Sequence, residues 1–362
     1  MTEKVIIGMS GGVDSAVAAK LLVADGYNVE AIYMKNWEED DFDQQEICTS
    51  KEDMHYAQNV CDELQIPFHA VNFASEYWDN VFEAFINSYN KGHTPNPDIL
   101  CNKEIKFKVF LDYAKKFKAD KIATGHYASV SYQDKKFFLS KSKDTNKDQT
   151  YFLYTLNQDQ LSQTLFPLQD LKKNQVRDIA KKNNFRCYDR KDSTGICFIG
   201  ERNFNKFISK YVENKKGGIY DSNNNHIGNH EGMSYLTIGQ RSGLGIGGKK
   251  NSKELPWYVY KKDITKNQVY VCQGSDNDLL FHKKIIFNQL NLISHNVEFL
   301  LSNEIEARIR HRGELKKCIV KKYKKNDFCI EFNDRMWAPA IGQSVVFYHK
   351  DICLGGGVII DF

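Results

Sequence analysis

The chain opens with a short apolar run, a turn built on two glycines and apolar side chains at helical spacing, and this order constrains the fold most. Residues Lys4–Gly8 are predicted to form a buried strand, and residues 13–25 a helix that ends at Gly26. Further strands are predicted at 28–34, 68–73 and 120–125, with helices at about 50–64, 75–89 and 102–117. Strands that alternate with helices indicate an α/β fold with a doubly wound parallel sheet.

The pattern changes after about residue 204, which predicts further domains. Residues 206–276 are rich in glycine, asparagine and short β-like runs, and they predict a small β-rich linking domain. From 277 to 362, alternating strands dominate and predict a C-terminal β-barrel. The predicted domains are therefore residues 1–205, 206–276 and 277–362. The polar segment 141–147 is expected to be a mobile loop.

Composition disfavours several classes of protein. The nine cysteines include no C-x-x-C pair, which argues against a zinc site and a secreted disulfide framework. The start of the sequence has no secretory apolar segment, and no apolar run is long enough to span a bilayer. We therefore expect a cytoplasmic protein with no membrane partner. A net charge of +4 permits nucleic-acid binding but does not argue for it.

The turn after the first strand is a candidate phosphate-binding loop. Glycines let backbone N–H groups approach a phosphate, and the following helix adds unsatisfied donors and the positive end of its dipole. Serine hydroxyls flank the glycines, and Asp14 is a candidate to help hold Mg²⁺ on the phosphates. A plain tight turn is the alternative, and the lysine of a Walker A loop is absent. The predicted ATP-binding residues of this loop are Gly8, Met9, Ser10, Gly11, Gly12, Val13, Asp14 and Ser15.

Two cysteines lie in segments that have features of reactive sites. Cys101 follows the proline-containing stretch 95–98 and precedes a predicted helix, whose N-terminus favours the thiolate form of a nearby cysteine. Cys197 lies in a polar, glycine-containing segment that is expected to be a movable loop. Each cysteine on its own is more often an ordinary cysteine than a catalytic one.

The sequence around these cysteines resembles the tRNA-specific 2-thiouridylase family. The matching segments, in family order, are MKNWEEDD, NPDILCNKEIKF, ATGHYA, KDQTYFLYTL, DSTGICFIGERNF, LTIGQRSGLGIGG and GQSVVFY. The phosphate loop resembles that of the ATP pyrophosphatase superfamily, whose members split ATP between the first and second phosphates. Ala16 stands where serine is common, which puts in doubt one hydroxyl near the phosphates. Ser129 stands where arginine is common, which puts in doubt one contact to RNA.

The resemblance implies an adenine nucleotide hydrolase-like catalytic domain and a sulfurtransferase that uses ATP and Mg²⁺ to thiolate the wobble uridine of tRNA. It implies that Cys197 carries a persulfide received from a sulfur-donor protein, and that Cys101 is the nucleophilic partner. Cys101 either attacks the persulfide to release sulfide or forms a transient disulfide with Cys197 after transfer.

The resemblance also implies positions for the substrates. Asp98 is implied as the acid–base residue, and Asn96, Pro97 and Asp98 as the pocket of a target base that has left its stack. Met34 and Gly125 end predicted strands, where α/β sheets bind nucleotides. For Met34, packing within the strand is an equally good interpretation.

A basic stretch near the C-terminus is a candidate RNA surface. Arg308, Arg310 and Arg312 alternate along a predicted strand, which places them on one face. That face either contacts phosphates or, as is more common, is simply solvated. The resemblance implies that the tRNA anticodon stem-loop contacts His126, Lys147, Asp148, Gln149, Arg310, His311 and Gln343.

Two other functions stay open. An adenylating enzyme that uses an amine or ammonia in place of sulfur would remain active without Cys101 and Cys197. A non-catalytic RNA-binding protein that keeps a nucleotide loop for structure would release no pyrophosphate from ATP in the presence of RNA.

Overall fold

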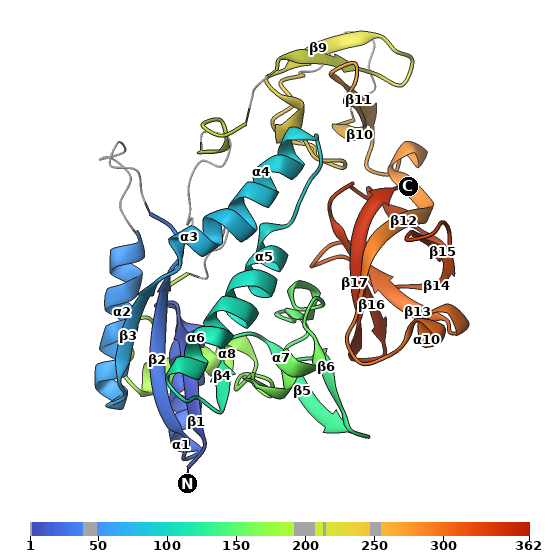
Figure 1. Ribbon diagram of the computed structural model, residues 1–362. Helices are drawn as coiled ribbons and strands as arrows, with labels where there is room; N and C mark the ends of the chain where they lie inside the picture. Colours follow the sequence, from blue (N-terminus) through green and yellow to red (C-terminus); the bar gives the residue numbers. More distant parts are fainter. Residues whose placement is uncertain (1, 39–48, 192–206, 213–214, 247–254) are drawn as a thin grey trace.

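The computed structural model describes residues 2–38, 49–191, 207–212, 215–246 and 255–362, and its N-terminal part contains a five-stranded parallel sheet (Figure 1). The strand order is β3-β2-β1-β4-β7. The strands are β1 (Lys4–Met9), β2 (Asn28–Lys35), β3 (Phe68–Asn72), β4 (Lys121–Ala123) and β7 (Thr164–Leu165). Because the chain turns to β2 on one side of β1 and later to β4 on the other, the carboxyl end of β1 is the switch point where such sheets bind ligands.

Helices cover both faces of this sheet. One face packs against α1 (Val13–Ala24), α2 (Thr49–Leu64) and α8 (Lys173–Lys182). The other face packs against two long helical runs, 74–90 and 97–116. These runs consist of α3 (Ala74–Tyr77), η1 (Trp78–Phe82), α4 (Glu83–Asn90), α5 (Pro97–Leu100), η2 (Cys101–Val109) and α6 (Phe110–Lys116). Successive strand residues point to opposite faces of the sheet, so that Val5 packs in one core cluster and Ile6 in the other. The predicted doubly wound α/β fold is confirmed.

Two β-rich parts follow. The smaller is a four-stranded sheet of order β10-β11-β8-β9, formed by β8 (Gly217–Tyr220), β9 (His226–His230), β10 (Trp257–Asp263) and β11 (Gln268–Gln273), with η4 (Met233–Tyr235) after β9. The larger is a closed barrel, since β12 pairs with both β15 and β17. Its elements are η5 (Asp278–Leu280), β12 (Phe281–Leu292), α10 (Val297–Ser302), β13 (Ile305–Arg308), β14 (Lys316–Lys322), β15 (Phe328–Trp337), β16 (Ser344–His349) and β17 (Ile352–Asp361). The predicted linking domain and C-terminal barrel are both present.

A hairpin from the N-terminal part extends the barrel sheet. It consists of β5 (Ala128–Gln133) and β6 (Lys136–Lys141), and β6 pairs with the start of β17 through Leu139 and Ser140. Beyond the hairpin lie η3 (Thr150–Phe152) and α7 (Gln158–Ser162). The boundaries predicted at 205/206 and 276/277 stay predictions, and this hairpin shows that segments of the first predicted domain pair with strands of the third.

The segment 141–147, which its polarity predicted to be a mobile loop, has two buried residues among exposed ones. Ser142 and Asp144 are buried, and the carboxylate of Asp144 accepts hydrogen bonds from the backbone N–H groups of Asn146 and Lys173. The contact with Lys173 anchors this segment in a way that local composition does not encode, and its mobility stays a prediction.

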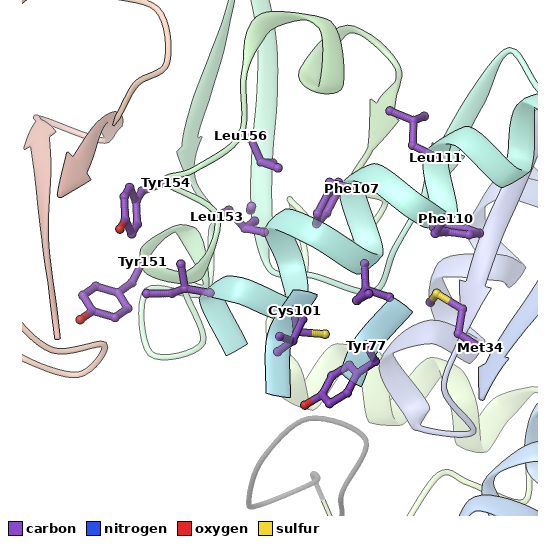
Figure 2. Packing of buried hydrophobic residues seen from close by; sticks show 14 of the residues in the cluster. Met34, Tyr77, Cys101, Phe107, Phe110, Leu111, Tyr151, Leu153, Tyr154 and Leu156 are labelled. Carbon is purple, nitrogen blue, oxygen red and sulfur yellow. The ribbon is translucent and has the colours of Figure 1, made fainter. Parts of the chain in front are cut away.

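The N-terminal part and the barrel share one hydrophobic core. Cys101, Tyr151 and Tyr154 lie in one buried cluster (Figure 2). The same cluster contains Val346 and Tyr348 of β16. The helix that carries Cys101 is therefore packed, through η3, against the barrel.

Candidate active site

The phosphate loop forms a compact turn at the carboxyl end of β1. Gly12 precedes the first residue of α1 with extended backbone angles, and Gly11 has a φ of +73°. A Cβ atom on Gly11 would lie 2.3 Å from the carbonyl oxygen of Asp53 in α2, so only glycine fits. The hydroxyl of Ser15 donates to the carbonyl oxygen of Gly12 and accepts a 3.2 Å hydrogen bond from the N–H of Ser10. The loop therefore holds its glycine backbone in one conformation at a helix N-terminus.

Asp14 lies at this helix N-terminus and has two partners from distant parts of the chain. The ammonium group of Lys173, at the start of α8, donates to both Asp14 carboxylate oxygens at 2.7 and 2.8 Å. The hydroxyl of Tyr127 donates to the same carboxylate at 2.8 Å. The loop lacks a Walker A lysine, but the fold brings a lysine to its edge from 159 residues away.

A second cation also contacts the loop. The guanidinium group of Arg190 donates to the carbonyl oxygen of Gly11 at 3.0 Å and pairs with Asp53 at 2.7 Å. It also lies 4.5 Å from the ring centroid of Tyr56. Burial raises the pKa of Asp53, and the neighbouring Arg190 opposes that rise. Two fixed cations beside oriented backbone amides suit a polyanionic phosphate chain.

The strand-end residues predicted to meet the nucleotide lie close to this loop. A Cβ atom on Gly125 would lie 2.8 Å from the backbone of Asp14 and Ser15, so the chain after β4 touches the start of α1. Gly8 and Met34 are neighbours as well, since a Cβ atom on Gly8 would lie 3.2 Å from the Met34 side chain. Met34 is buried in the same core cluster as Cys101 and Phe110, which fits the packing interpretation of its side chain and leaves its backbone role a prediction.

The helix that carries Cys101 begins earlier than the sequence suggested. Asn96 caps it by accepting hydrogen bonds from the N–H groups of Asp98 and Ile99, and Pro97 occupies the first helical position. The predicted start near residue 102 was therefore wrong, because a side-chain cap and a proline at N1 act together five residues earlier. Cys101 lies beyond the first turn, where the effect of the helix dipole has largely decayed.

Cys101 has no exposed surface and lies in the buried cluster with Tyr77 and Phe107 (Figure 2). In this arrangement its thiol cannot meet a base, so reaction requires the surrounding segments to move. Cys197, its predicted partner, lies outside the described residues. The two cysteines therefore stay a predicted pair.

The remaining buried cysteines have the character of packing residues. Burial raises the pKa of Cys187 to about 11 and that of Cys61 to about 12. Cys353 likewise has its pKa raised to about 12 by burial. Such thiols stay protonated at neutral pH and are poor nucleophiles.

The residues predicted to contact tRNA are mostly engaged with other parts of the protein. His126 is buried beside Phe107 and shares a 2.8 Å hydrogen bond with Thr124, and burial holds its pKa well below its usual range. Gln343 donates to the carbonyl oxygen of Thr94, in the loop before Pro95, at 2.8 Å. Lys147 is half-buried. Contacts between tRNA and this set stay predictions.

The barrel arginines do not share one exposed face. Strand β13 ends at Arg308, which is buried and pairs with Asp148 at 2.6 Å. Arg310 donates to the carbonyl oxygens of Ile238 and Ala338, and only Arg312 is exposed. The prediction that the three arginines share one strand face was wrong for two reasons. Strand β13 ends at Arg308, before the other two arginines, and Arg308 is buried against the carboxylate of Asp148.

Comparison with known proteins identifies the family. Family models match three consecutive segments: a tRNA methyl transferase HUP domain over residues 3–201, a tRNA methyl transferase PRC-barrel domain over 205–273 and an aminomethyltransferase beta-barrel domain over 282–359. The tRNA-specific 2-thiouridylase MnmA of Francisella tularensis subsp. tularensis (strain WY96-3418) is 51% identical over 359 residues, which cover 99% of each chain. The chain belongs to the tRNA-specific 2-thiouridylase family.

Other comparisons agree with this assignment or add little to it. The 2-thiouridylase MnmA of Francisella tularensis subsp. novicida (strain U112) is also 51% identical over 99% of both chains. Among solved structures, the NMN synthetase from Francisella tularensis is 20% identical, with a TM-score of 0.33, over 53% of this chain and 67% of that one. That structural likeness is too low to bear on the site.

Sequence reasoning missed several residues of this 2-thiouridylase site. Lys173, Tyr127, Arg190 and Asp53 all contact the phosphate loop or its first helical residues, yet each is at least 38 residues away from the loop in sequence. The only signal was that Tyr127 lies in the family-like segment ATGHYA. No spacing rule pairs residue 14 with residue 173, so the fold was needed to find them.

Within the described residues, no group of three or more His, Cys, Asp or Glu side chains is arranged to hold a metal ion. Both carboxylate oxygens of Asp14 already accept hydrogen bonds from Lys173. The predicted contact of Asp14 with a magnesium ion on the ATP phosphates therefore stays a prediction. No helix in the described part of the chain combines the length and apolar character that crossing a membrane requires.

Proposed function

We propose that this protein is a tRNA-uridine 2-sulfurtransferase that thiolates the wobble uridine of tRNA at the expense of ATP. The observation that carries the proposal is 51% identity to a tRNA-specific 2-thiouridylase over 99% of both chains. The site has the parts this reaction needs: a phosphate loop with two adjacent cations, and a cysteine on a capped helix that packs against the same sheet. The substrates are ATP, the anticodon stem-loop of tRNA and a persulfide supplied by a sulfur-donor protein.

The first step makes the uridine reactive. The 2-oxygen of uracil attacks the first phosphate of ATP, the bond to the second phosphate breaks, and pyrophosphate leaves. Backbone amides of the loop 10–12, with Lys173 and Arg190, stabilise the charge on the departing pyrophosphate. Magnesium fits this scheme as the counter-ion that arrives with the ATP phosphates, with Asp14 as its predicted contact on the protein.

Sulfur then replaces AMP at carbon 2 of the base. In one order, the terminal sulfur of a Cys197 persulfide attacks carbon 2 and AMP leaves, after which the Cys101 thiolate attacks the Cys197 sulfur and releases the thiolated base. In the other, Cys101 first attacks the Cys197 sulfur and releases hydrosulfide, which displaces AMP. Both orders leave a Cys101–Cys197 disulfide, and a dithiol reductant must supply two electrons to restore the thiols. We infer a cytoplasmic setting because it provides such a reductant.

Asp98 and its neighbours suit the role of base pocket. Asn96, Pro97 and Asp98 form the start of the helix that carries Cys101, so a base held there would lie one turn from the nucleophile. We infer that Asp98 moves a proton during the reaction. The burial of Cys101 requires that tRNA binding or loop movement opens this region first.

The test combines a chemical assay with matched cysteine variants. The protein is incubated with ATP, Mg²⁺, a persulfide source and unmodified tRNA, and 2-thiouridine is measured by mass spectrometry. We expect product from the wild type and from Cys329→Ser, a half-buried barrel cysteine, but at least 10²-fold less from Cys101→Ser and Cys197→Ser. A tRNA with cytidine in place of the wobble uridine should give no product.

Two outcomes would support the other functions. If both cysteine variants form AMP as fast as the wild type does, the protein is an adenylating enzyme that does not use cysteine sulfur chemistry. Binding of tRNA with no release of pyrophosphate from ATP would indicate a non-catalytic RNA-binding protein.

A further inference from the structure

Tyr127 touches the phosphate loop through its side chain. It is almost completely buried and lies between β4 and β5, and its hydroxyl donates to Asp14 at 2.8 Å. The same Asp14 carboxylate holds the ammonium group of Lys173. Tyr127 is therefore a neutral donor to the same carboxylate that holds the lysine.

The backbone of Tyr127 is held from the opposite direction. Its N–H donates to the side-chain carbonyl of Gln149 at 2.9 Å, and its carbonyl oxygen accepts the N–H of Gln149 at 2.9 Å. A two-point contact of this kind fixes the position of the residue more firmly than a single hydrogen bond. The location of Tyr127 is thus determined by the segment that contains Gln149.

That segment is in turn held by the barrel. Asp148 pairs with Arg308 at 2.6 Å, and its carbonyl oxygen lies 2.9 Å from the Nε2 atom of His311. An unbroken series of contacts therefore runs from the barrel through Asp148, Gln149 and Tyr127 to Asp14. Every contact in the series is within hydrogen-bonding distance.

We propose that Tyr127 is a positioning residue for the ATP step, linking the way the barrel docks on residues 148–149 to the orientation of Asp14 and Lys173 at the phosphate loop. This inference rests on the proposed function for its meaning, because it gives the barrel, where tRNA is expected to bind, a physical route to the ATP site. The simpler interpretation is that the hydroxyl is merely a satisfied buried group. The two interpretations differ in how removal of the hydroxyl changes the affinity of the protein for ATP.

The experiment removes one hydroxyl and measures ATP binding without tRNA. The probe is α,β-methylene-ATP, which cannot be split at the bond in question, and its dissociation constant is measured by titration calorimetry. The matched control is Tyr154→Phe, which removes another buried tyrosine hydroxyl, bonded to Ser344 at 3.1 Å in the interface with the barrel. We expect Tyr127→Phe to weaken probe binding about tenfold and Tyr154→Phe to leave it within twofold, although both lower the unfolding midpoint.

A double-mutant cycle tests the link to the barrel side. Gln149→Ala should weaken probe binding in the wild-type background but add less than twofold in the Tyr127→Phe background, because the contact through which it acts is already gone. With tRNA present, Tyr127→Phe should lower kcat/KM for ATP about tenfold and change KM for tRNA less than twofold.

The inference is overturned if Tyr127→Phe binds the probe as the wild type does, if Tyr154→Phe weakens binding equally, or if the effects of Gln149→Ala and Tyr127→Phe simply add. Probe binding does not depend on thiolation. A protein that shows the expected binding pattern but forms no thiouridine would therefore refute the proposed function and leave this inference standing.

Discussion

Gly11 combines two constraints that no other residue type can meet. Its φ of +73° is in the left-handed region, and an added Cβ atom would lie 2.3 Å from the backbone oxygen of Asp53. We expect Gly11→Ala to displace α2 from the loop and to reduce release of pyrophosphate from ATP by at least about 10²-fold. A coupled pyrophosphate assay with saturating tRNA measures this.

Gly26 provides the matched control for Gly11. Its φ is +84°, but no atom lies within 4 Å of an added Cβ atom. Gly26→Ala should therefore only reduce the free energy of unfolding, by about 1 kcal/mol, and leave turnover unchanged. Equal activity of the two variants would show that the close approach to Asp53 is not needed for ATP use.

Lys173 should behave as a binding residue and not as a structural one. It lies in the first turn of α8, where lysine has no favourable dipole interaction, and its ammonium group is aimed at the phosphate loop. We expect Lys173→Ala to lower kcat/KM for ATP about 10²-fold, because one stabilising charge is lost. Lys181→Ala, an exposed lysine on the same helix, is the control, and steady-state kinetics with varied ATP compares them. Similar kinetics for both variants would show that the charge of Lys173 does not contribute to the use of ATP.

At the scale of whole elements, the sequence predicts what is locally encoded. The phosphate loop and its flanking strand and helix were predicted because apolar spacing and glycine position are local signals. The β5–β6 hairpin could be seen only in the structure to join β17, since Leu139 and Cys353 are more than 200 residues apart. The buried state of Arg308 was missed for the same reason: its partner, Asp148, lies 160 residues away.

Lys262 of strand β10 contacts the catalytic part. The ammonium group of Lys262 donates to the carbonyl oxygen of Gly92 at 2.9 Å, and burial lowers its pKa to about 8. In the unfolded chain this lysine titrates near pH 10.5, so between pH 8 and 10.5 the unfolded state binds the additional proton. Its contribution to the free energy of unfolding must therefore rise as the pH increases through this window.

A lysine-to-methionine change isolates that effect. Between pH 7 and pH 10, the stability of the wild type should increase relative to Lys262→Met by on the order of 1–3 kcal/mol, measured by urea denaturation at several pH values. His93 and His230 lie nearby, but burial already lowers the pKa of each, so both stay neutral in this range. Parallel pH profiles for the two proteins would mean that the Lys262 ammonium group remains solvated.

At the scale of the whole molecule, the barrel and the catalytic part are joined by a buried charge pair. The side chains of Arg308 and Asp148 are 9% and 2% exposed, and their closest atoms are 2.6 Å apart. The hydroxyl of Tyr348 accepts a hydrogen bond from Arg308, and the hydroxyl of Thr150 donates one to Asp148. A buried pair of this kind need not add stability compared with apolar side chains, but loss of one partner leaves a charge without compensation.

Asp148→Ala should therefore reduce the free energy of unfolding by about 3–5 kcal/mol, because the guanidinium group of Arg308 would be left buried and unpaired. The double variant Asp148→Ala, Arg308→Met should recover most of that loss, since no unpaired charge remains. Lys216 and Glu231 form the control pair: they are 2.9 Å apart but 76% and 77% exposed, so Glu231→Ala should cost less than about 1 kcal/mol. Urea denaturation of the wild type and the three variants measures these free energies of unfolding. If Asp148→Ala costs no more than Glu231→Ala, the buried charge pair does not help to hold the barrel on residues 148–149, and that role falls to the β6–β17 pairing and the shared apolar cluster.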